Sequence, residues 1–193
     1  ILDATLARAD EGSLATVSEP AILVVVDDDV VYAPYMLQKL VEAQQADHSR
    51  SFSFYAYRDG GITVGQGCDG FSFWTPNLDG IAEWAAPVLD QPALFVHDDL
   101  WISFFLQRRG VRIRRILPDR GVLVYEQLER ESSLRELDGD LRRDLVHAEG
   151  LRYLMENESP TRRMRIGWQL WRAAERLGLP RLRHRLRRLL RAA

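Results

Sequence analysis

An apolar run that ends in three consecutive carboxylates constrains the fold of this chain more than any other feature. The run covers residues 22–26, and four of its five side chains are β-branched. This composition predicts a β-strand buried on both faces, as in the centre of an α/β sheet. Asp27, Asp28 and Asp29 follow directly. The sequence therefore predicts an acidic cluster at the carboxyl end of a strand, where open α/β sheets bind their ligands.

The Asp triplet has two interpretations. Adjacent acids repel one another, and burying them unpaired is costly, so they predict a bound cation. Mg²⁺ and Mn²⁺ prefer carboxylate oxygens and commonly bridge them to a diphosphate. The alternative is a solvated acidic turn that caps the next helix, since Asp is a good N-cap residue.

Length and composition exclude several classes of protein. A chain of 193 residues with 46% hydrophobic residues builds one globular domain, or one domain with an appendage. The single cysteine, Cys68, excludes a disulfide framework and a cysteine-built zinc site. No apolar run reaches the length of a membrane span, and no signal peptide is recognised.

The net charge of −2 conceals a strong asymmetry. Residues 161–193 contain eleven arginines and one acid, Glu175, which gives this segment a charge of +10. The remaining 15 basic and 27 acidic residues give the rest of the chain −12. The sequence thus predicts an acidic body and a basic tail.

The periodicity of apolar residues predicts the other elements. Pro34 suits the first turn of a helix that extends to about residue 46. Strands are expected at residues 51–57, 111–117 and 122–125. Further helices are expected at residues 78–86, from the acidic pair at 98–99 to Gly110, and at residues 133–137, 140–156, 161–177 and 180–191.

Residues 58–70 are rich in glycine, which permits positive φ angles and a close approach of the backbone to a ligand. Aromatic residues flank this segment on both sides, so we interpret it as a substrate-contacting loop. A plain β-hairpin is the alternative.

A second acidic pair, Asp98-Asp99, follows a short apolar stretch and begins a helix. Acids in the first turn of a helix also suit its dipole, so Asp98 has a purely structural interpretation as an N-cap.

The ordered set of Asp27-Asp28-Asp29, the glycine-rich segment Gly65-Gln66-Gly67-Cys68-Asp69-Gly70 and the pair in His97-Asp98-Asp99-Leu100-Trp101 resembles a known family. It is similar to the metal-dependent nucleotide-sugar glycosyltransferases of the GT-A fold, in particular the bacterial inverting enzymes. The resemblance covers roughly residues 22–116. It implies an α/β fold with a Rossmann-like GT-A mixed sheet and flanking helices, to which this chain adds a helical C-terminal extension.

The resemblance also implies roles for individual residues. Asp29 and Asp27 would bind Mn²⁺ or Mg²⁺, and Asp27 and Asp28, with Gly67 and Gly70, would contact the nucleotide-diphosphate sugar. Asp99 would be the catalytic base, and Asp98 would orient it or bind the acceptor hydroxyl of a glycan or lipid-linked acceptor. His147 is a candidate further metal ligand and His97 a candidate for tuning the base, although a lone helical histidine is usually structural.

Only about twenty residues precede the strand that ends in the Asp triplet, where the family has two or three β-α units. We therefore expect residues 1–128 to form a partial GT-A-like domain, with its N-terminal units outside this chain or lost in a reduced relative. Two other functions stay open. One is a metal-dependent phospho- or nucleotidyltransferase, because strand-end aspartates serve phosphoryl transfer equally well. The other is a non-catalytic domain that binds sugar or scaffolds a partner.

Residues 129–193 are expected to form a helical region with a basic amphipathic tail. Leucines recur at three- and four-residue spacing between arginines from Leu179 onward. Such a helix can lie on an anionic membrane, with Trp168 and Trp171 as interfacial anchors. Docking on the acidic body is the main alternative, and nucleic acid is not expected as a partner. The expected location is cytoplasmic, peripheral on the inner face of the membrane.

Overall fold

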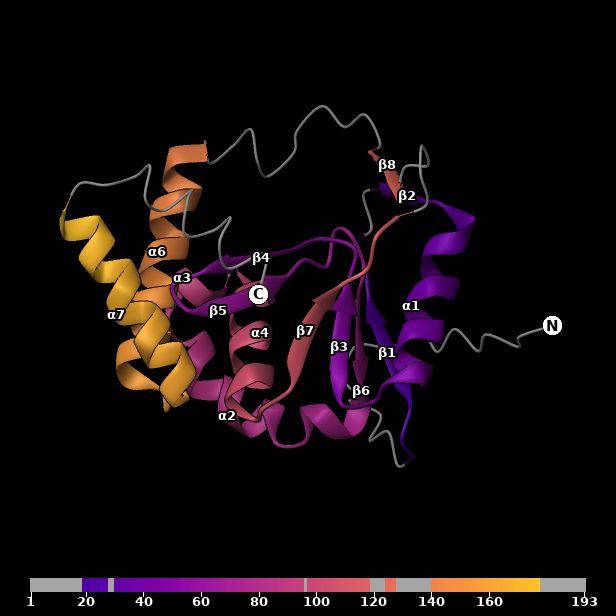
Figure 1. Ribbon diagram of the computed structural model, residues 1–193, viewed down its shortest axis with the longest axis horizontal. Helices are drawn as coiled ribbons and strands as arrows, with labels where there is room; N and C mark the ends of the chain where they lie inside the picture. Colours follow the sequence, from indigo (N-terminus) through magenta and orange to yellow (C-terminus); the bar gives the residue numbers. More distant parts are fainter. Residues whose placement is uncertain (1–18, 28–29, 96, 119–123, 128–139, 178–193) are drawn as a thin grey trace.

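A four-stranded mixed sheet forms the centre of the computed structural model, which describes residues 19–27, 30–95, 97–118, 124–127 and 140–177. The strand order is β1-β6-β3-β7, and β6 runs antiparallel to both of its neighbours while β3 and β7 are parallel. The ends of β1 and β3 and the start of β6 therefore lie at one edge of the sheet (Figure 1). The four strands are β1 (Ile22–Val25), β3 (Arg50–Ser53), β6 (Phe71–Trp74) and β7 (Arg112–Arg115).

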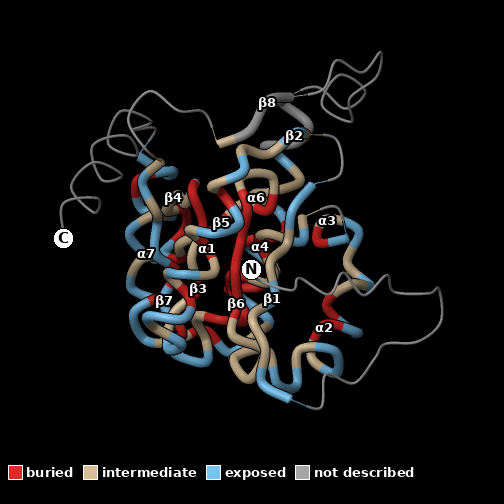
Figure 2. The backbone as a smooth tube through the Cα atoms, turned by 90° about the vertical axis from the view of Figure 1, so that its right-hand side faces the viewer, coloured by how far each residue is buried: buried red, intermediate tan, exposed pale blue. Residues whose placement is uncertain are grey.

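Helices cover both faces of this sheet (Figure 1). Helix α1 (Pro34–Ala46) packs on one face, where Met36 and Leu40 are buried against Phe54. Helix α4 (Asp98–Arg108) packs on the other face, where Leu106 joins the apolar side chains of β6 and β7. Figure 2 shows buried residues along β3 and β6, which are the two central strands.

Helices α6 and α7 lie beyond α4 in Figure 1 and form a third layer. Its core joins side chains of α2, α3, α4, α6 and α7 with those of β5, which belongs to the hairpin of β4 and β5, and Leu151, Leu154 and Trp168 are among them. The elements are β4 (Ala56–Asp59), β5 (Ile62–Gly65), α2 (Ile81–Leu89), α3 (Pro92–Phe95), α6 (Asp140–Asn157) and α7 (Arg162–Arg176). A 3₁₀ helix, η1 (Thr75–Leu78), follows β6, and a separate two-stranded sheet pairs β2 (Val30–Tyr32) with β8 (Tyr125–Gln127).

The mixed α/β class and several predicted elements are confirmed. Helix α1 begins at Pro34 and ends at Ala46, and α4 begins at Asp98 and ends just before Gly110. Helices α6 and α7 lie within a residue of their predicted bounds. The helices predicted at residues 133–137 and 180–191 lie outside the described residues, as does the start of the strand predicted at 122–125.

The prediction that the first strand is buried on both faces is wrong. Among the described strands, β1 has β6 as its single neighbour. Leu23 and the following Val26 are 44% and 45% exposed, whereas Val24 and Val25 pack against the two cores on either side of the sheet. The apolar run correctly predicted a strand. A strand with one neighbour, however, leaves some of its side chains exposed to solvent.

The strand predicted at residues 51–57 is in fact two strands. β3 ends at Ser53 and β4 begins at Ala56. The Ser53 hydroxyl donates to the carbonyl of Tyr55 at 2.8 Å and lies 3.1 Å from that of Gln66, so it stabilises the bend between the strands. Ser51 and Ser53 are fully buried, so the polar side of β3 faces the interior rather than solvent.

The helix predicted at residues 78–86 is also corrected. Its first residue belongs to η1, and α2 runs to Leu89 with Pro87 inside it. Because proline has no backbone N–H, the last turn of α2 forms without the hydrogen bond that residue 87 would otherwise donate.

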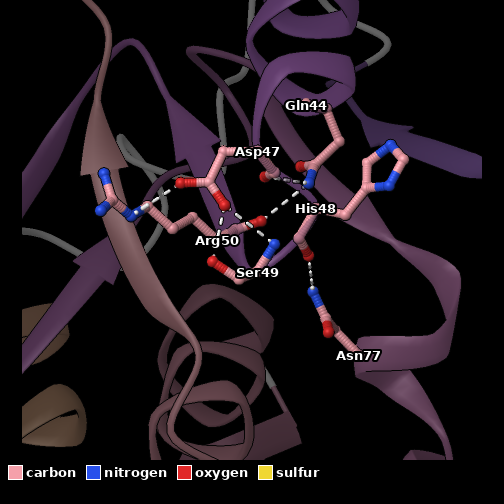
Figure 3. Close-up of polar contacts among 6 residues, drawn as sticks. All are labelled: Gln44, Asp47, His48, Ser49, Arg50 and Asn77. Carbon is pink, nitrogen blue, oxygen red and sulfur yellow. Dashed lines mark hydrogen bonds and ion pairs between the residues drawn. The ribbon is translucent and has the colours of Figure 1, made fainter.

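The turn between α1 and β3 contains a polar network that fixes the register of β3 (Figure 3). The fully buried Gln44 amide donates to the carbonyl of Arg50 at 2.7 Å and accepts from the Ser72 hydroxyl at 3.1 Å. Hydrogen bonds from Ser49 lower the pKa of the Asp47 carboxyl, which also pairs with Arg50 at 3.0 Å. These polar groups are satisfied by one another and serve the fold.

The proposed membrane anchors Trp168 and Trp171 have a different role. Trp168 is 7% exposed, and the two indoles stack with their centroids 4.8 Å apart against the core of the third layer. Helix α7 therefore docks on the body through its tryptophans. The buried Trp168 is not available to a lipid surface, and Trp171 is partly buried against the same core.

Candidate functional site

Asp27 lies at the edge of the sheet, two residues after the end of β1. Its backbone N–H donates to the Tyr32 hydroxyl at 2.7 Å, and that hydroxyl donates to the carbonyl of Cys68 at 3.1 Å. Tyr32 thus joins the acidic strand end to the loop that leads into β6. No motif in the sequence marks this role of Tyr32, because it consists of two hydrogen bonds to backbone atoms.

Gly67 lies between two carboxylates that are more than seventy residues apart in the sequence. Its N–H donates to Asp99 Oδ1 at 2.8 Å. A Cβ atom placed on Gly67 would lie 3.3 Å from Asp99 Oδ1 and 3.8 Å from Asp27 Oδ1. The structure therefore brings Asp27, Asp99 and the glycine-rich loop together, and the glycine leaves room for both carboxylates.

Asp99 lies in the first turn of helix α4. His97 is the N-cap residue, so the alternative interpretation of Asp98 as the N-cap is wrong by one position. The exposed Asp98 carboxylate accepts from the N–H of Asp99 at 2.9 Å. Asp98 therefore steadies the backbone that carries Asp99, while Asp99 itself is half-buried and faces Gly67.

The pKa shifts of Cys68 and Asp69 also indicate that several negative charges lie close together at this loop. Burial raises the pKa of the Cys68 thiol, and the nearby carboxylates of Asp69, Asp27 and Asp99 raise it further. Burial also raises the pKa of Asp69, against the opposing effects of the Cys68 thiol and the Arg115 guanidinium. Three carboxylates that act on one thiol make this edge attractive to a cation.

Gly70 has a packing role. Its φ angle is +81°, and a Cβ there would lie 2.8 Å from Leu40 Cδ1 and 2.9 Å from Met36 Sδ. Its N–H donates to the carbonyl of Gly67 at 2.7 Å and closes the turn. The predicted ligand-binding glycine thus lies against α1, and its contacts explain the requirement for glycine without a ligand.

Asp28 and Asp29 lie outside the described residues, so their predicted contacts with donor and metal stay predictions. Within the part of the chain that the structure describes, His, Cys, Asp and Glu side chains do not form a group of three or more suited to a metal ion. The donors at hand near Gly67 are carboxylate oxygens, which is the chemistry that Mg²⁺ and Mn²⁺ prefer.

His97 and His147, the two histidines proposed for the site, contact each other in the third layer. Their ring centroids are 5.4 Å apart in an edge-to-face arrangement. His147 Nε2 lies 3.5 Å from Asp59 Oδ2, which is close enough for an ion pair but lacks hydrogen-bond geometry. Because Asp59 ends β4 and His147 lies on α6, this contact joins the hairpin to a helix. It gives His147 a structural explanation, and His97 links that contact to the start of α4.

Comparisons with protein-family models, with curated proteins and with solved structures found no match to this chain.

Proposed function

We propose that the chain is a metal-dependent, inverting glycosyltransferase that transfers a sugar from a nucleotide-diphosphate sugar to an acceptor hydroxyl. One observation carries the proposal: Asp27, from the end of β1, and Asp99, from the start of α4, both flank Gly67. This reaction needs two acidic functions side by side. One holds the cation that neutralises the leaving diphosphate, and the other accepts the proton of the attacking hydroxyl.

Asp99 is the proposed base. Its Oδ1 is held by the N–H of Gly67, and its backbone is held by the Asp98 carboxylate. A base that is fixed by such contacts is oriented before the acceptor arrives, which favours catalysis. Asp98 is a positioning residue in this proposal, because its carboxylate acts through the backbone of Asp99.

Asp27, together with Asp29, is the proposed holder of Mn²⁺ or Mg²⁺, with Asp28 and Gly67 next to the donor. When bound, the cation would stabilise the negative charge that develops on the diphosphate. Tyr32 and Asp27 N–H fix the strand end against the Cys68 carbonyl, so the donor side and the acceptor side of the site share one loop.

The mixed sheet is compatible with the finer proposal of a Rossmann-like GT-A fold. Its single antiparallel strand, β6, follows directly after the glycine-rich loop. The proposal includes a glycan or lipid-linked acceptor and a cytoplasmic location, where a free thiol such as that of Cys68 stays reduced.

The test separates binding from turnover. The protein is incubated with nucleotide-diphosphate sugars and Mn²⁺, and the released nucleotide is identified. Replacement of Asp99 by Asn should lower turnover by a factor on the order of 10² to 10⁴ and leave donor binding nearly intact. Asp27→Asn and Asp29→Asn should instead abolish the Mn²⁺-dependent donor binding measured by calorimetry.

Glu83→Gln is the matched control, because it removes one carboxylate from the first turn of another helix, α2. It should leave turnover unchanged. Release of a nucleoside diphosphate identifies sugar transfer, whereas release of a monophosphate or of pyrophosphate identifies transfer of a phosphoryl or nucleotidyl group and contradicts the proposal. Normal turnover in Asp99→Asn would leave Asp99 as a residue of the helix start alone.

A further inference from the structure

Helix α7 has two apolar faces, and in the part of the chain that the structure describes, one of them is covered while the other is exposed. The covered face carries Met164, Trp168 and Ala174, which are 2%, 7% and 7% exposed and pack on the body of the protein. Gly167 on the same side lies directly against Gly61 at the tip of the hairpin. The orientation of the helix is therefore fixed, and its opposite face is directed to solvent.

The opposite face carries a second apolar stripe. Ile166, Leu170 and Leu177 are 49%, 56% and 68% exposed, and Ala173 lies between them in the same helical row. Their spacing of four, three and four residues places them on one side of a helix. Single exposed apolar side chains are ordinary, but a continuous row on one helix indicates a contact surface.

Arginines border this outer stripe. Five of the six charged residues from Thr161 to Leu177 are arginines, and the sixth is Glu175. Arg163 lies on one side of the stripe, and Arg162 and Arg176 on the other, by their helical positions. An open groove beside the stripe is lined by Gln169, Arg172, Ala173 and Arg176, so two guanidinium groups lie next to exposed apolar surface.

We propose that this outer face of α7, defined by Ile166, Leu170, Ala173 and Leu177 with the bordering arginines, lies on an anionic lipid surface. The apolar stripe would enter the boundary between headgroups and acyl chains, and the arginines would contact the lipid phosphates. Guanidinium groups suit this role because they bind phosphate oxygens through paired hydrogen bonds. The residues that the structure describes contain no helix long and apolar enough to cross a membrane, so the contact is one along the surface.

Charge favours this occupant over a second copy of the chain. An apolar stripe that mediated self-association would be brought together with the arginines of the other copy, and like charges would repel. The Arg172–Glu156 pair, at 3.2 Å, is exposed. Arg162, Arg163 and Arg176 form no ion pair with another described residue, so their charge favours a partner rich in negative charge. The inference goes beyond the proposed glycosyl transfer and does not depend on it.

The test is flotation of the full chain with vesicles of neutral phosphatidylcholine, with and without anionic phosphatidylglycerol. The unaltered chain should float with the anionic vesicles at low salt, and binding should fall as salt screens the arginines. Ile166→Glu combined with Leu170→Glu should lower the partition coefficient by roughly tenfold or more. Arg162→Gln combined with Arg163→Gln should weaken binding less and flatten its dependence on salt.

Leu37→Glu combined with Leu117→Glu is the matched control. These leucines are 49% and 71% exposed and lie outside α7, so the double variant adds the same charge without touching the outer face. It should bind as the unaltered chain does. All variants change exposed positions, and thermal melting checks that they fold.

Two results would overturn the inference. One is undiminished flotation of the Ile166→Glu and Leu170→Glu variant, which would assign lipid binding to the segment after Leu177. The other is the absence of flotation, and a dimer of the unaltered chain that this variant dissociates in sedimentation would then identify a second copy as the occupant.

Discussion

The two ends of the glycine-rich segment, residues 58–70, perform different tasks. At its first end, Gly60 and Gly61 turn the β4–β5 hairpin, and both would clash with helices if they carried a side chain: Gly60 with Leu151 of α6, Gly61 with the backbone of α7. At its second end, Gly67 has an ordinary φ angle and lies between the carboxylates of Asp27 and Asp99. The hairpin interpretation is therefore confirmed for the first end of the segment, and the substrate-contacting loop stays a prediction for its second end.

The comparison shows that glycine density alone does not distinguish close packing from a binding site. What distinguishes them is the kind of atom that lies where a Cβ atom of the glycine would be. Beside Gly61 the neighbours are Met164 O at 2.5 Å and Trp168 N at 2.9 Å, which are backbone atoms that cannot move independently. Beside Gly67 they are side-chain oxygens, and the N–H of the glycine is itself a donor to one of them.

The largest expected effect on stability comes from Gly61→Ala. The substitution combines an unfavourable positive φ of +94° with a clash against the α7 backbone. Gly110→Ala is the matched control, because Gly110 has φ +86° and no atom within 4 Å of the added Cβ. Both should lose about 1–2 kcal/mol through the backbone angle, and Gly61→Ala should lose roughly 1–3 kcal/mol more through overpacking.

Urea denaturation of the two variants measures this difference in the free energy of unfolding. Gly167→Ala tests the same contact from the helix side. Alanine is the better helix former by about 1 kcal/mol. A Cβ on Gly167 would nevertheless collide with the backbone of Gly61, so Gly167→Ala should lose stability instead of gaining it. Equal unfolding free energies of Gly61→Ala and Gly110→Ala would mean that the hairpin tip does not press against α7.

Gly67→Ala should have the opposite profile. Its added Cβ would lie 3.3 Å from Asp99 Oδ1 and 3.4 Å from Val25 Cγ1, so neighbours need to shift by only a few tenths of an ångström. The free energy of unfolding should change by less than about 1 kcal/mol. Sugar transfer should fall by roughly tenfold or more, because a small displacement of the proposed base is costly to the reaction.

Gly61→Ala and Gly67→Ala together separate an effect on packing from an effect on the candidate site. At a temperature where Gly61→Ala is folded, it should retain turnover, whereas Gly67→Ala should retain stability and lose turnover. Loss of stability in Gly67→Ala as large as in Gly61→Ala would make both glycines packing residues.

Local signals in the sequence were sufficient for the elements whose ends are set by local chemistry. Pro34 marked the start of α1, and Gly110 marked the end of α4. The bend between β3 and β4 could not be predicted, because it depends on a hydrogen bond from Ser53 to Gln66, which belongs to another part of the chain. The exposure of Leu23 could not be predicted either, since it depends on how many strands lie beside β1.

In the candidate site, too, local features could be predicted from the sequence and long-range contacts could not. Asp27 and Asp99 were each recognisable from an apolar stretch followed by acids, and the resemblance to a family suggested that they act together. Their contact through Gly67 requires the position of α4 relative to β1, which is set by packing across the sheet. Tyr32 was missed because its role consists of two hydrogen bonds to backbone atoms, Asp27 N and Cys68 O, and such bonds have no sequence pattern.

The smallest expected effect concerns the Cys68 thiol, which reports the charge around Gly67 without any substrate. Burial and the carboxylates of Asp69, Asp27 and Asp99 raise its pKa, so the neutral thiol is favoured in the folded protein. An exposed cysteine ionises near pH 8.5, at about its ordinary pKa. The native thiol should therefore react slowly with iodoacetamide at pH 8, and its rate should still rise with pH where that of an exposed cysteine has levelled off.

Asp27→Asn and Asp99→Asn each remove one negative charge near the thiol, which lowers its pKa and should speed alkylation on the order of two- to fivefold. Asp79→Asn is the control, because this aspartate is not among the charges that act on Cys68 and its loss should leave the rate unchanged. The linkage has a definite sign: the unfolded thiol ionises first, so its contribution to stability is complete below its unfolded pKa and declines as the pH rises above it. A rate that responds to neither Asp27→Asn nor Asp99→Asn would contradict the convergence of the two carboxylates at Gly67, whatever the activity of the protein proves to be.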